Sequence, residues 1–203
     1  MVEPRVEPRR RRASSEAKRL RLLDAAEELM LTDGYAAVTS RALAAKVGIP
    51  PGLVHYYFAT LDDLFVELLR RRATPTITRM EDALSAPEPL RAWWEIASDP
   101  RGTRLFTELL AAANHRPPLK VELGEMAKRV RAAQVEALRR LLPEYGLDGF
   151  APALIASTVQ GLAFSTVSDA VAGFDTDHDI AIEATRALID ELEQRRRGYL
   201  GLQ

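Results

Sequence analysis

The chain has 203 residues and a net charge of −1 at pH 7, and 47% of its residues are hydrophobic, enough to fill a small and a larger helical domain. It contains no cysteine, which excludes disulfide bonds, thiolate chemistry and cysteine–zinc sites. Residues 1–12 are too charged for a secretory signal peptide, and we expect a cytoplasmic protein.

The first predicted elements are a basic flexible arm over residues 1–14 and a helix from Ser14 or Ser15 to Asp33. Residues 1–60 carry a net charge of +3 and the remainder −4, which suits a protein that approaches DNA with its N-terminal part. In the arm, Arg9–Arg12 fit either a minor-groove contact or a solvated disordered tail. The apolar spacing of the helix comes from Leu22, Ala25, Ala26, Leu29 and Met30, with Gly34 expected to end it and Tyr35 to enter the core.

Residues 39–58 predict two short helices joined by a tight turn. Thr39 can cap the first helix, and Val38 and Leu43 can form a hydrophobic staple across its start. Gly48 tolerates positive φ and can end this helix, and the two prolines that follow Ile49 prevent its continuation. Such a helix-turn-helix reads DNA in the major groove.

The second helix of this pair has an inward and an outward face. Val54 and Phe58 lie four residues apart and face inward, so the residues around them cannot all be buried. A short helix that presents aromatic and hydrogen-bonding groups suits a major groove about 12 Å wide. We expect base contacts from Arg41, Gly52, Leu53 and Tyr56, and phosphate contacts from Thr39, Ser40, His55, Tyr57 and Thr60. Arg41 is the strongest base reader, because a guanidinium can bridge O6 and N7 of guanine.

The next predicted helix begins after Thr60, which can cap it together with Asp63. Pro75 should end or kink this helix near residues 73–75. We therefore expect a DNA-binding domain over residues 15–60, a connecting helix and linker over 61–86, and a larger helical domain over 87–203.

Beyond residue 86 every predicted element is helical, so the expected fold class is all-α. The expected helices are Pro89–Ala97, Arg101–Asn114, Leu119–Leu142, Pro152–Gly173 and Asp177–Arg197. The uncharged run from Gly149 to Ser168 is long enough to cross a bilayer, but its serine, threonine and glutamine residues favour a buried interface helix. We expect no membrane partner.

The larger domain contains candidates for ligand binding. The aromatic and apolar candidates, which can line a cavity or simply fill the core, are Trp93, Trp94, Phe106, Met126, Leu162 and Phe164. Only one of the adjacent tryptophans is expected to face a cavity, because helix neighbours point about 100° apart. His115 lacks companion ligands. A further run contains Asp175, Asp177, His178 and Asp179. We interpret it as acidic charge at a helix N-terminus and not as a metal site, so no metal or cofactor is expected.

The last two helices are expected to form a dimer interface, because one is rich in small residues and the other has apolar residues along one side. The interface candidates are Leu154, Gly161, Ala181, Ala184, Leu188 and Leu192. A symmetric dimer would set two recognition helices about 34 Å apart, as successive major grooves require.

A known family has the same order of residues. The segments are Leu22-Leu23-Asp24-Ala25-Ala26, Gly34-Tyr35, Val38-Thr39, Leu43-Ala44, Val47-Gly48-Ile49 and His55-Tyr56-Tyr57-Phe58, and together they resemble the TetR (tetracycline-repressor-like) transcription regulators over residues 15–70. The resemblance implies a homodimer with an N-terminal DNA-binding domain and a helical C-terminal domain that binds a small molecule and releases operator DNA.

Two positions differ from the family pattern. His55 stands where the family usually has a phosphate-binding tyrosine, and the resemblance therefore favours a phosphate contact over an exposed histidine without a role. Leu61 stands where the family usually has a phosphate-contacting lysine.

The favoured function is a homodimeric repressor that an apolar or amphipathic small molecule releases from a palindromic operator in double-stranded DNA. The alternative is a DNA-binding regulator without a small-molecule effector, controlled by a partner protein or by its own abundance. An enzyme is not expected, because the three histidines are widely separated and the sequence has no Ser/His/Asp order, HExxH motif or phosphate loop.

Overall fold

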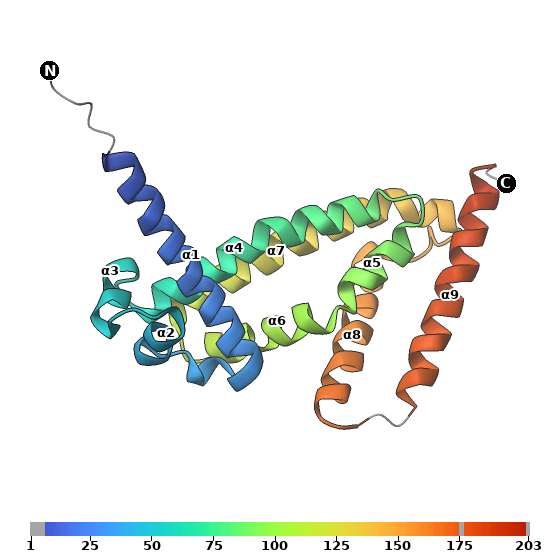
Figure 1. Cartoon of the computed structure of the whole chain (residues 1–203). Helices are drawn as coiled ribbons and strands as arrows, with labels where there is room; N and C mark the ends of the chain where they lie inside the picture. The colour runs from blue at the N-terminus through green and yellow to red at the C-terminus, as the bar shows by residue number, and fades with distance from the viewer. Residues whose placement is uncertain (1–6, 175–176, 202–203) are drawn as a thin grey trace, which may run out of the picture. The chain divides into compact units, whose positions relative to one another are not determined.

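The computed structural model describes residues 7–174 and 177–201, and this part of the chain is helical without strands (Figure 1). The all-α expectation is confirmed. The elements are α1 (Glu7–Asp33), η1 (Tyr35–Ala37), α2 (Ser40–Val47), η2 (Pro51–Leu53), α3 (Val54–Tyr57), α4 (Leu61–Leu84), α5 (Pro89–Ala97), α6 (Pro100–Ala113), α7 (Pro117–Leu141), η3 (Leu142–Tyr145), α8 (Pro152–Val171) and α9 (His178–Tyr199).

The chain divides into two compact units. The first unit comprises Met1–Arg71 and Thr107–Glu122, and the second comprises Arg72–Phe106 and Leu123–Gln203. Helices α4, α6 and α7 each contribute residues to both units. Residues 107–122 thus fold with the N-terminal segment, although a division by position along the chain placed them in the larger domain.

Helix α1 begins earlier than its sequence predicted. It starts at Glu7, so residues 9–12 are helical and do not lie in a flexible arm, while residues 1–6 lie outside the described part. Pro8 is compatible with this start, because backbone N–H groups in the first turn of a helix have no partner within the helix and proline lacks this group. The predicted end is confirmed: α1 stops at Asp33, and Gly34 follows with φ of 81°.

The core of the first unit is made by the apolar faces of its first four α-helices. Leu43 and Phe65 are completely shielded from solvent, and each such side chain contributes about 1.5–3 kcal/mol on burial. The other buried residues include Leu22, Leu23, Ala26, Met30, Ala44, Val54, Phe58, Leu64 and Leu68. This core holds the helix-turn-helix rigidly.

Helix α4 does not end near Pro75, so of the predicted end or kink, the end is wrong and the kink stays a prediction. The helix continues from Leu61 to Leu84 with Pro75 inside it. A proline in a helix costs about 3 kcal/mol, because it removes one hydrogen bond and crowds the preceding turn. Met80, Ala83 and Leu84 beyond the proline are buried, and this packing offsets the local cost.

The second unit has its own core, in which α5 packs against both α8 and α9 (Figure 1). Its largest fully buried side chains are Trp93 and Tyr145, and Trp94 is buried in the same cluster. The remaining buried members include Met80, Leu84, Leu90, Leu138, Leu142, Ala156, Ala163 and Ile189. The predicted span of α5 is confirmed at both ends, and α6 to α9 lie within a few residues of their predicted spans.

Candidate DNA-binding site

Helix α2 is defined at both ends by backbone geometry. The Thr39 hydroxyl accepts a hydrogen bond from the Ala42 N–H at 3.1 Å, which caps the helix start. At the other end Gly48 is left-handed with φ of 73°, and the N–H groups of Gly48 and Ile49 both donate to the Ala44 carbonyl at 2.9 Å. The predicted cap and stop are confirmed.

The turn leads into a short second helix. The Leu53 N–H donates to the Pro50 carbonyl at 2.9 Å, which closes the 3-10 turn η2, and a single α-helical turn, α3, follows. Val54 and Phe58 are 1% and 2% exposed, so the predicted inward face is confirmed. These two anchors fix which side of α3 is left for DNA.

The candidate DNA-contacting residues lie on the outer side of the helix-turn-helix. The Tyr56 side chain is 75% exposed, and its ring meets that of Tyr57 edge-on with 5.1 Å between the centroids. The Ser40 hydroxyl lies 3.3 Å from Nε2 of His55, so the structure brings these two phosphate candidates together across the turn. The other exposed candidates are Thr39, Arg41, Gly52 and Thr60, while Ser40, Leu53 and Tyr57 are half-buried.

Arg41 is the most available cation of this surface. Its side chain is exposed, and no ion pair or hydrogen bond engages it among residues 7–174 and 177–201. Lys46, by contrast, pairs with Glu28 at 2.7 Å. A guanidinium with no protein partner can make bidentate contacts with a base or phosphate without first breaking an ion pair.

Thr60 and Asp63 form the predicted capping box at the start of α4. The Asp63 N–H donates to the Thr60 hydroxyl at 3.1 Å, and the Asp63 carboxylate accepts from the Thr60 N–H at 2.9 Å and from its hydroxyl at 2.8 Å. The Thr60 hydroxyl is therefore engaged in the cap, and its phosphate contact stays a prediction. Leu61 is the first residue of α4 and is half-buried.

Two arginines of α1 support the helix-turn-helix, and sequence reasoning missed both. Arg21 donates to the Val47 carbonyl at 3.1 Å, which satisfies a free carbonyl at the end of α2. Arg19 pairs with Glu67 and lies over the Phe58 ring at 5.1 Å. Charge spacing within one helix cannot reveal such contacts, because each partner lies on another element.

The end of α6 contacts the turn that precedes α2. The Glu108 carboxylate accepts a hydrogen bond from the Tyr35 N–H at 2.7 Å. The Tyr35 ring stacks on the His115 ring with 6.4 Å between the centroids. His115 therefore has a packing contact, and a ligand contact by this histidine stays a prediction. Tyr35 is half-buried, which agrees with its expected structural role.

The start of α7 contacts α4 in the same unit. Arg116 pairs with Asp62 and lies over the Phe65 ring at 4.7 Å. Arg70 donates to Glu122 at 2.6 Å, and this carboxylate raises the pKa of the arginine. Residues 107–122 thus hold both the turn before α2 and the first turns of α4 in the first unit.

The ligand candidates differ in burial, and they do not line the hollow that the described residues form at the start of α5. Trp93 and Trp94 are both buried in the core of the second unit, and which of them could face a ligand stays a prediction. Phe106 is 39% exposed, and Met126, Leu162 and Phe164 are half-buried. A shallow hollow of about 330 Å³ is lined by other residues, namely Ala86, Pro87, Glu88, Arg91, Ala92 and Glu95. A ligand role for the six candidates stays a prediction.

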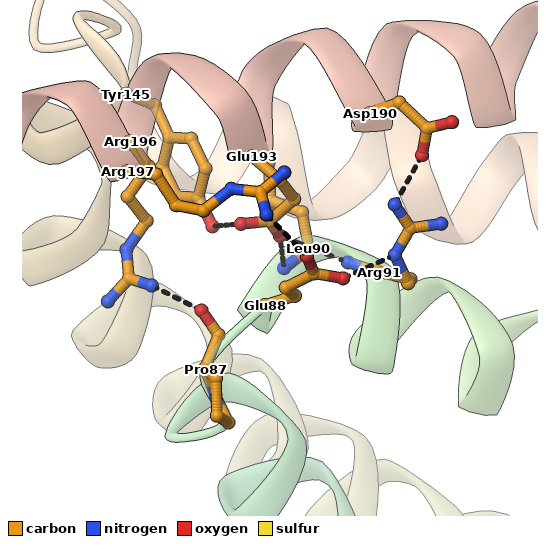
Figure 2. Close-up of polar contacts among 9 residues, drawn as sticks. All are labelled: Pro87, Glu88, Leu90, Arg91, Tyr145, Asp190, Glu193, Arg196 and Arg197. Carbon is orange, nitrogen blue, oxygen red and sulfur yellow. Dashed lines mark hydrogen bonds and ion pairs between the residues drawn. The ribbon is translucent and has the colours of Figure 1, made fainter. Parts of the chain in front are cut away.

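A buried carboxylate organises the second unit (Figure 2). Glu193 of α9 is 1% exposed, and it accepts hydrogen bonds from the Leu90 N–H at 2.8 Å, the Arg91 N–H at 3.3 Å and the Tyr145 hydroxyl at 3.0 Å. It therefore accepts hydrogen bonds from N–H groups at the start of α5 that have no partner within the helix. Its negative charge is attracted by the partial positive charge of this helix end. Burial and the nearby Glu193 carboxylate raise the pKa of Tyr145, which stays protonated as a donor.

The dimer candidates lie mostly at the surface of α8 and α9. Leu154 and Leu188 are 55% and 56% exposed, whereas Leu192 is half-buried against the core. Gly161, Ala181 and Ala184 are exposed. Helix α8 is also long and apolar enough by composition to cross a membrane, a weak signal because core helices of soluble proteins meet the same criteria.

No group of three potential metal ligands occurs within the described ranges. Asp175 lies outside them, so the acidic run before α9 is described only in part. Asp177 precedes α9 with a left-handed φ of 62° and makes no side-chain cap.

The comparisons agree with this geometry. Residues 22–68 match the family model described as bacterial regulatory proteins, tetR family. No curated protein sequence matches the chain significantly.

Solved structures share the fold over nearly the whole chain. A candidate transcriptional regulator from Pseudomonas aeruginosa PAO1 is 19% identical, with 95% of this chain and 96% of that chain covered and a TM-score of 0.66. A candidate transcriptional regulator from Saccharomonospora viridis, in complex with choline, is 17% identical over 92% and 96% of the two chains, with a TM-score of 0.67. A TetR transcription regulator from Haloarcula marismortui is 17% identical over 91% and 96%, with a TM-score of 0.62.

At these identities the structural likeness establishes the fold, and the family assignment comes from residues 22–68. That segment contains the capped α2, the turn at Gly48 and the exposed face of α3. Residues 22–68 therefore form a DNA-binding domain of the tetR family type with its helix-turn-helix intact, and this domain makes the protein a DNA-binding transcriptional regulator.

Proposed function

We propose that the protein is a homodimeric repressor that binds a palindromic operator and is released from it by a small molecule. The observation that carries the proposal is the outer face of the helix-turn-helix, where Arg41 is free of protein partners and Ser40 lies beside His55. Arg41 and Tyr56 would contact bases, and the Ser40–His55 pair would contact phosphate. The cytoplasm is the compartment in which such a regulator meets DNA.

The apolar surface of α8 and α9 supports the dimer. Leu154, Val171, Ile180 and Leu188 are all more than half exposed, which is costly for a lone subunit in water. A symmetric interface would bury the same patch on both copies. It would also give two recognition helices the spacing of about 34 Å that successive major grooves require.

Chain continuity supports control by an effector. Helices α4, α6 and α7 each contribute to both compact units, so a shift of their segments in the second unit can reach the turn before α2 through Glu108 and α4 through Arg116. The Saccharomonospora viridis protein of this fold holds choline, which supports a small-molecule effector for this fold. Such coupling is typically worth about 1–3 kcal/mol.

The filled core of the second unit favours the alternative, a regulator without a small-molecule effector. Trp93, Trp94 and Tyr145 occupy the centre of the core, and the hollow at Glu88 and Arg91 is shallow. A partner protein or the abundance of the regulator would then control occupancy of the operator.

Two measurements on the full chain test the proposal. Light scattering should give the mass of a dimer, and selection from random duplexes should return a palindrome with half-sites about one helical turn apart. A monomer that selects no palindrome would overturn it. With the operator in hand, a fall of about fivefold or more in affinity on adding a fractionated metabolite pool supports release by a small molecule, and indifference to every fraction supports the alternative.

A further inference from the structure

One half-buried arginine of the second unit has a buried nitrogen without a partner. Among side-chain nitrogen and oxygen atoms of residues 7–174 and 177–201, Nη1 of Arg131 is the buried one that makes no hydrogen bond. The side chain as a whole is half-buried on α7. A guanidinium is always charged, and placing a charged N–H away from water without an acceptor is strongly unfavourable. An unfilled requirement of this kind points to an acceptor that binds there.

The neighbours of Arg131 on α7 combine polar and apolar groups. Gln134 follows three residues later on the same helix face and is only 3% exposed. Its amide donates to Gln160 of α8 over 3.5 Å, a long and weak hydrogen bond. Val130 and Ala133, on either side of these positions, pack against the apolar core. The Gln134 amide, which makes only a weak hydrogen bond, is thus a second donor near the Arg131 guanidinium.

The less exposed carboxylates of the second unit are committed elsewhere. In its described part, each acidic residue that is buried or half-buried has other hydrogen-bond or ion-pair partners; these residues are Glu88, Asp99, Glu144, Asp169, Asp190 and Glu193. A change of rotamer at Arg131 would have to break an existing interaction to gain one of these acids. An anion from outside the chain could bind the guanidinium without breaking any of them.

We propose that Arg131 and Gln134 form the anion-binding end of the effector site, and that the effector is a small molecule with a carboxylate or phosphate head and an apolar body. The guanidinium would donate to one oxygen of the head and the Gln134 amide to another. The apolar body would lie against the α7–α8 seam, where the buried residues are the small Ala156 and Ala163. This inference names the effector class and rests on the proposed ligand-responsive function.

A first experiment tests whether the guanidinium has a structural partner. Full-length protein is refolded from denaturant to remove carried ligands, and the melting temperatures of Arg131→Met and of the matched control Arg129→Met are measured. Arg129 is an exposed arginine on the same helix. Because Arg131→Met keeps an unbranched stem and removes an uncompensated charge, we expect the melting temperature to stay or rise. A clear fall at Arg131 that the control does not show would mean a structural ion pair and would overturn the proposal.

A second experiment tests the class of ligand with probes that share an octyl body. Octanoate or octyl phosphate at about ten times Kd should raise the melting temperature of the parent by roughly 3–6 °C, and neutral octanamide and cationic octyltrimethylammonium should not. Arg131→Met should weaken anion binding at least about tenfold, and Arg129→Met should leave it unchanged. The better of the two anions identifies the head group.

The proposal is overturned if neither anion stabilises the parent, if octanamide or the cation stabilises it as well as the anions do, or if Arg131→Met retains the parental affinity. Operator binding is measured on the same samples. Binding of an anion at Arg131 without any operator binding would contradict the proposed repressor function but support the proposed anion site. Specific operator binding by a protein that binds no anion would do the reverse.

Discussion

The Glu108 carboxylate accepts the backbone N–H of Tyr35 at 2.7 Å, across 73 positions of the sequence. The bond joins the end of α6 to the residue at which the chain leaves the Gly34 turn, where φ is 81°. A Cβ at position 34 would lie 3.5 Å from the same carboxylate, so the turn also approaches Glu108 closely. The turn that leads into the helix-turn-helix is therefore held by a charged acceptor from a distant helix.

Removing this acceptor should loosen the first unit. We expect Glu108→Ala to lower the free energy of unfolding by about 1–3 kcal/mol, because a charged hydrogen bond is lost and the Tyr35 N–H is left half-buried. The drop in melting temperature, measured by circular dichroism, should be roughly 2–12 °C. The exposed Glu95→Ala serves as the matched control and should change little. Equal stability of both variants would show that the bond is dispensable.

Arg41 should determine part of the operator sequence. Replacing it with alanine should cost about 1–3 kcal/mol of binding to the preferred operator and relax the preference at one base pair in each half-site. Selection from random duplexes and titration by gel shift measure the two effects. Arg79→Ala, an exposed arginine of α4 outside the first unit, is the control and should bind as the parent does. An unchanged base preference in Arg41→Ala would assign the reading of bases to other residues.

Tyr57 should contribute affinity without choice of sequence. Its hydroxyl is a phosphate donor in the proposed complex, so Tyr57→Phe should weaken binding to operator and random duplex by the same factor, about two- to tenfold. Parallel titrations with both duplexes check this. A loss confined to the operator would instead make Tyr57 a base reader.

The buried phenol should make stability depend on alkaline pH. Burial and the Glu193 carboxylate raise the pKa of Tyr145, so the folded protein holds this proton more tightly than the unfolded chain, in which a tyrosine has a pKa of about 10. The stabilisation is fully present below about pH 10 and is lost as the pH rises further. Tyr145→Phe should lower the free energy of unfolding by about 1–3 kcal/mol near neutral pH, and its difference from the parent should shrink at alkaline pH.

Urea denaturation between about pH 8 and pH 11 measures this dependence. Tyr199→Phe, at a residue that is 67% exposed, is the control and should follow the parent throughout. A difference between Tyr145→Phe and the parent that stays constant with pH would contradict the linkage.

The exposed leucine of α9 tests the dimer directly. Leu188→Glu places a charge in the proposed interface and should yield a folded monomer by light scattering, with operator affinity reduced about a hundredfold or more because the two half-sites no longer bind together. Gln194→Glu adds the same charge at another exposed position of α9 and should remain dimeric. A Leu188→Glu protein that stays dimeric would move the interface elsewhere.

Local chemistry made the helix-turn-helix readable from the sequence. The Thr39 cap, the left-handed Gly48 and the inward pair Val54 and Phe58 all act over a few residues, and the structure has each of them where it was predicted. The Thr60–Asp63 box is local in the same way. Residue type and spacing suffice for such features, because both partners lie within one turn of chain.

Non-local packing accounts for the failures. By local rules Pro75 should have ended or kinked α4, but the helix continues through it to the buried residues beyond. Spacing on one helix also could not show that the core of the second unit buries both Trp93 and Trp94. Burial depends on what the other helices supply, which one helix alone does not encode.

From the sequence alone came the helical class, the helix-turn-helix and its outward residues, because caps, breakers and apolar periodicity act between neighbours in the chain. Only the tertiary structure decided that Glu108 holds Tyr35, that Glu193 is buried at the start of α5, and that Arg131 is left without an acid. These contacts depend on which charged groups come together when distant helices pack. A charged side chain has many possible partners along the chain, and the fold determines which of them it meets.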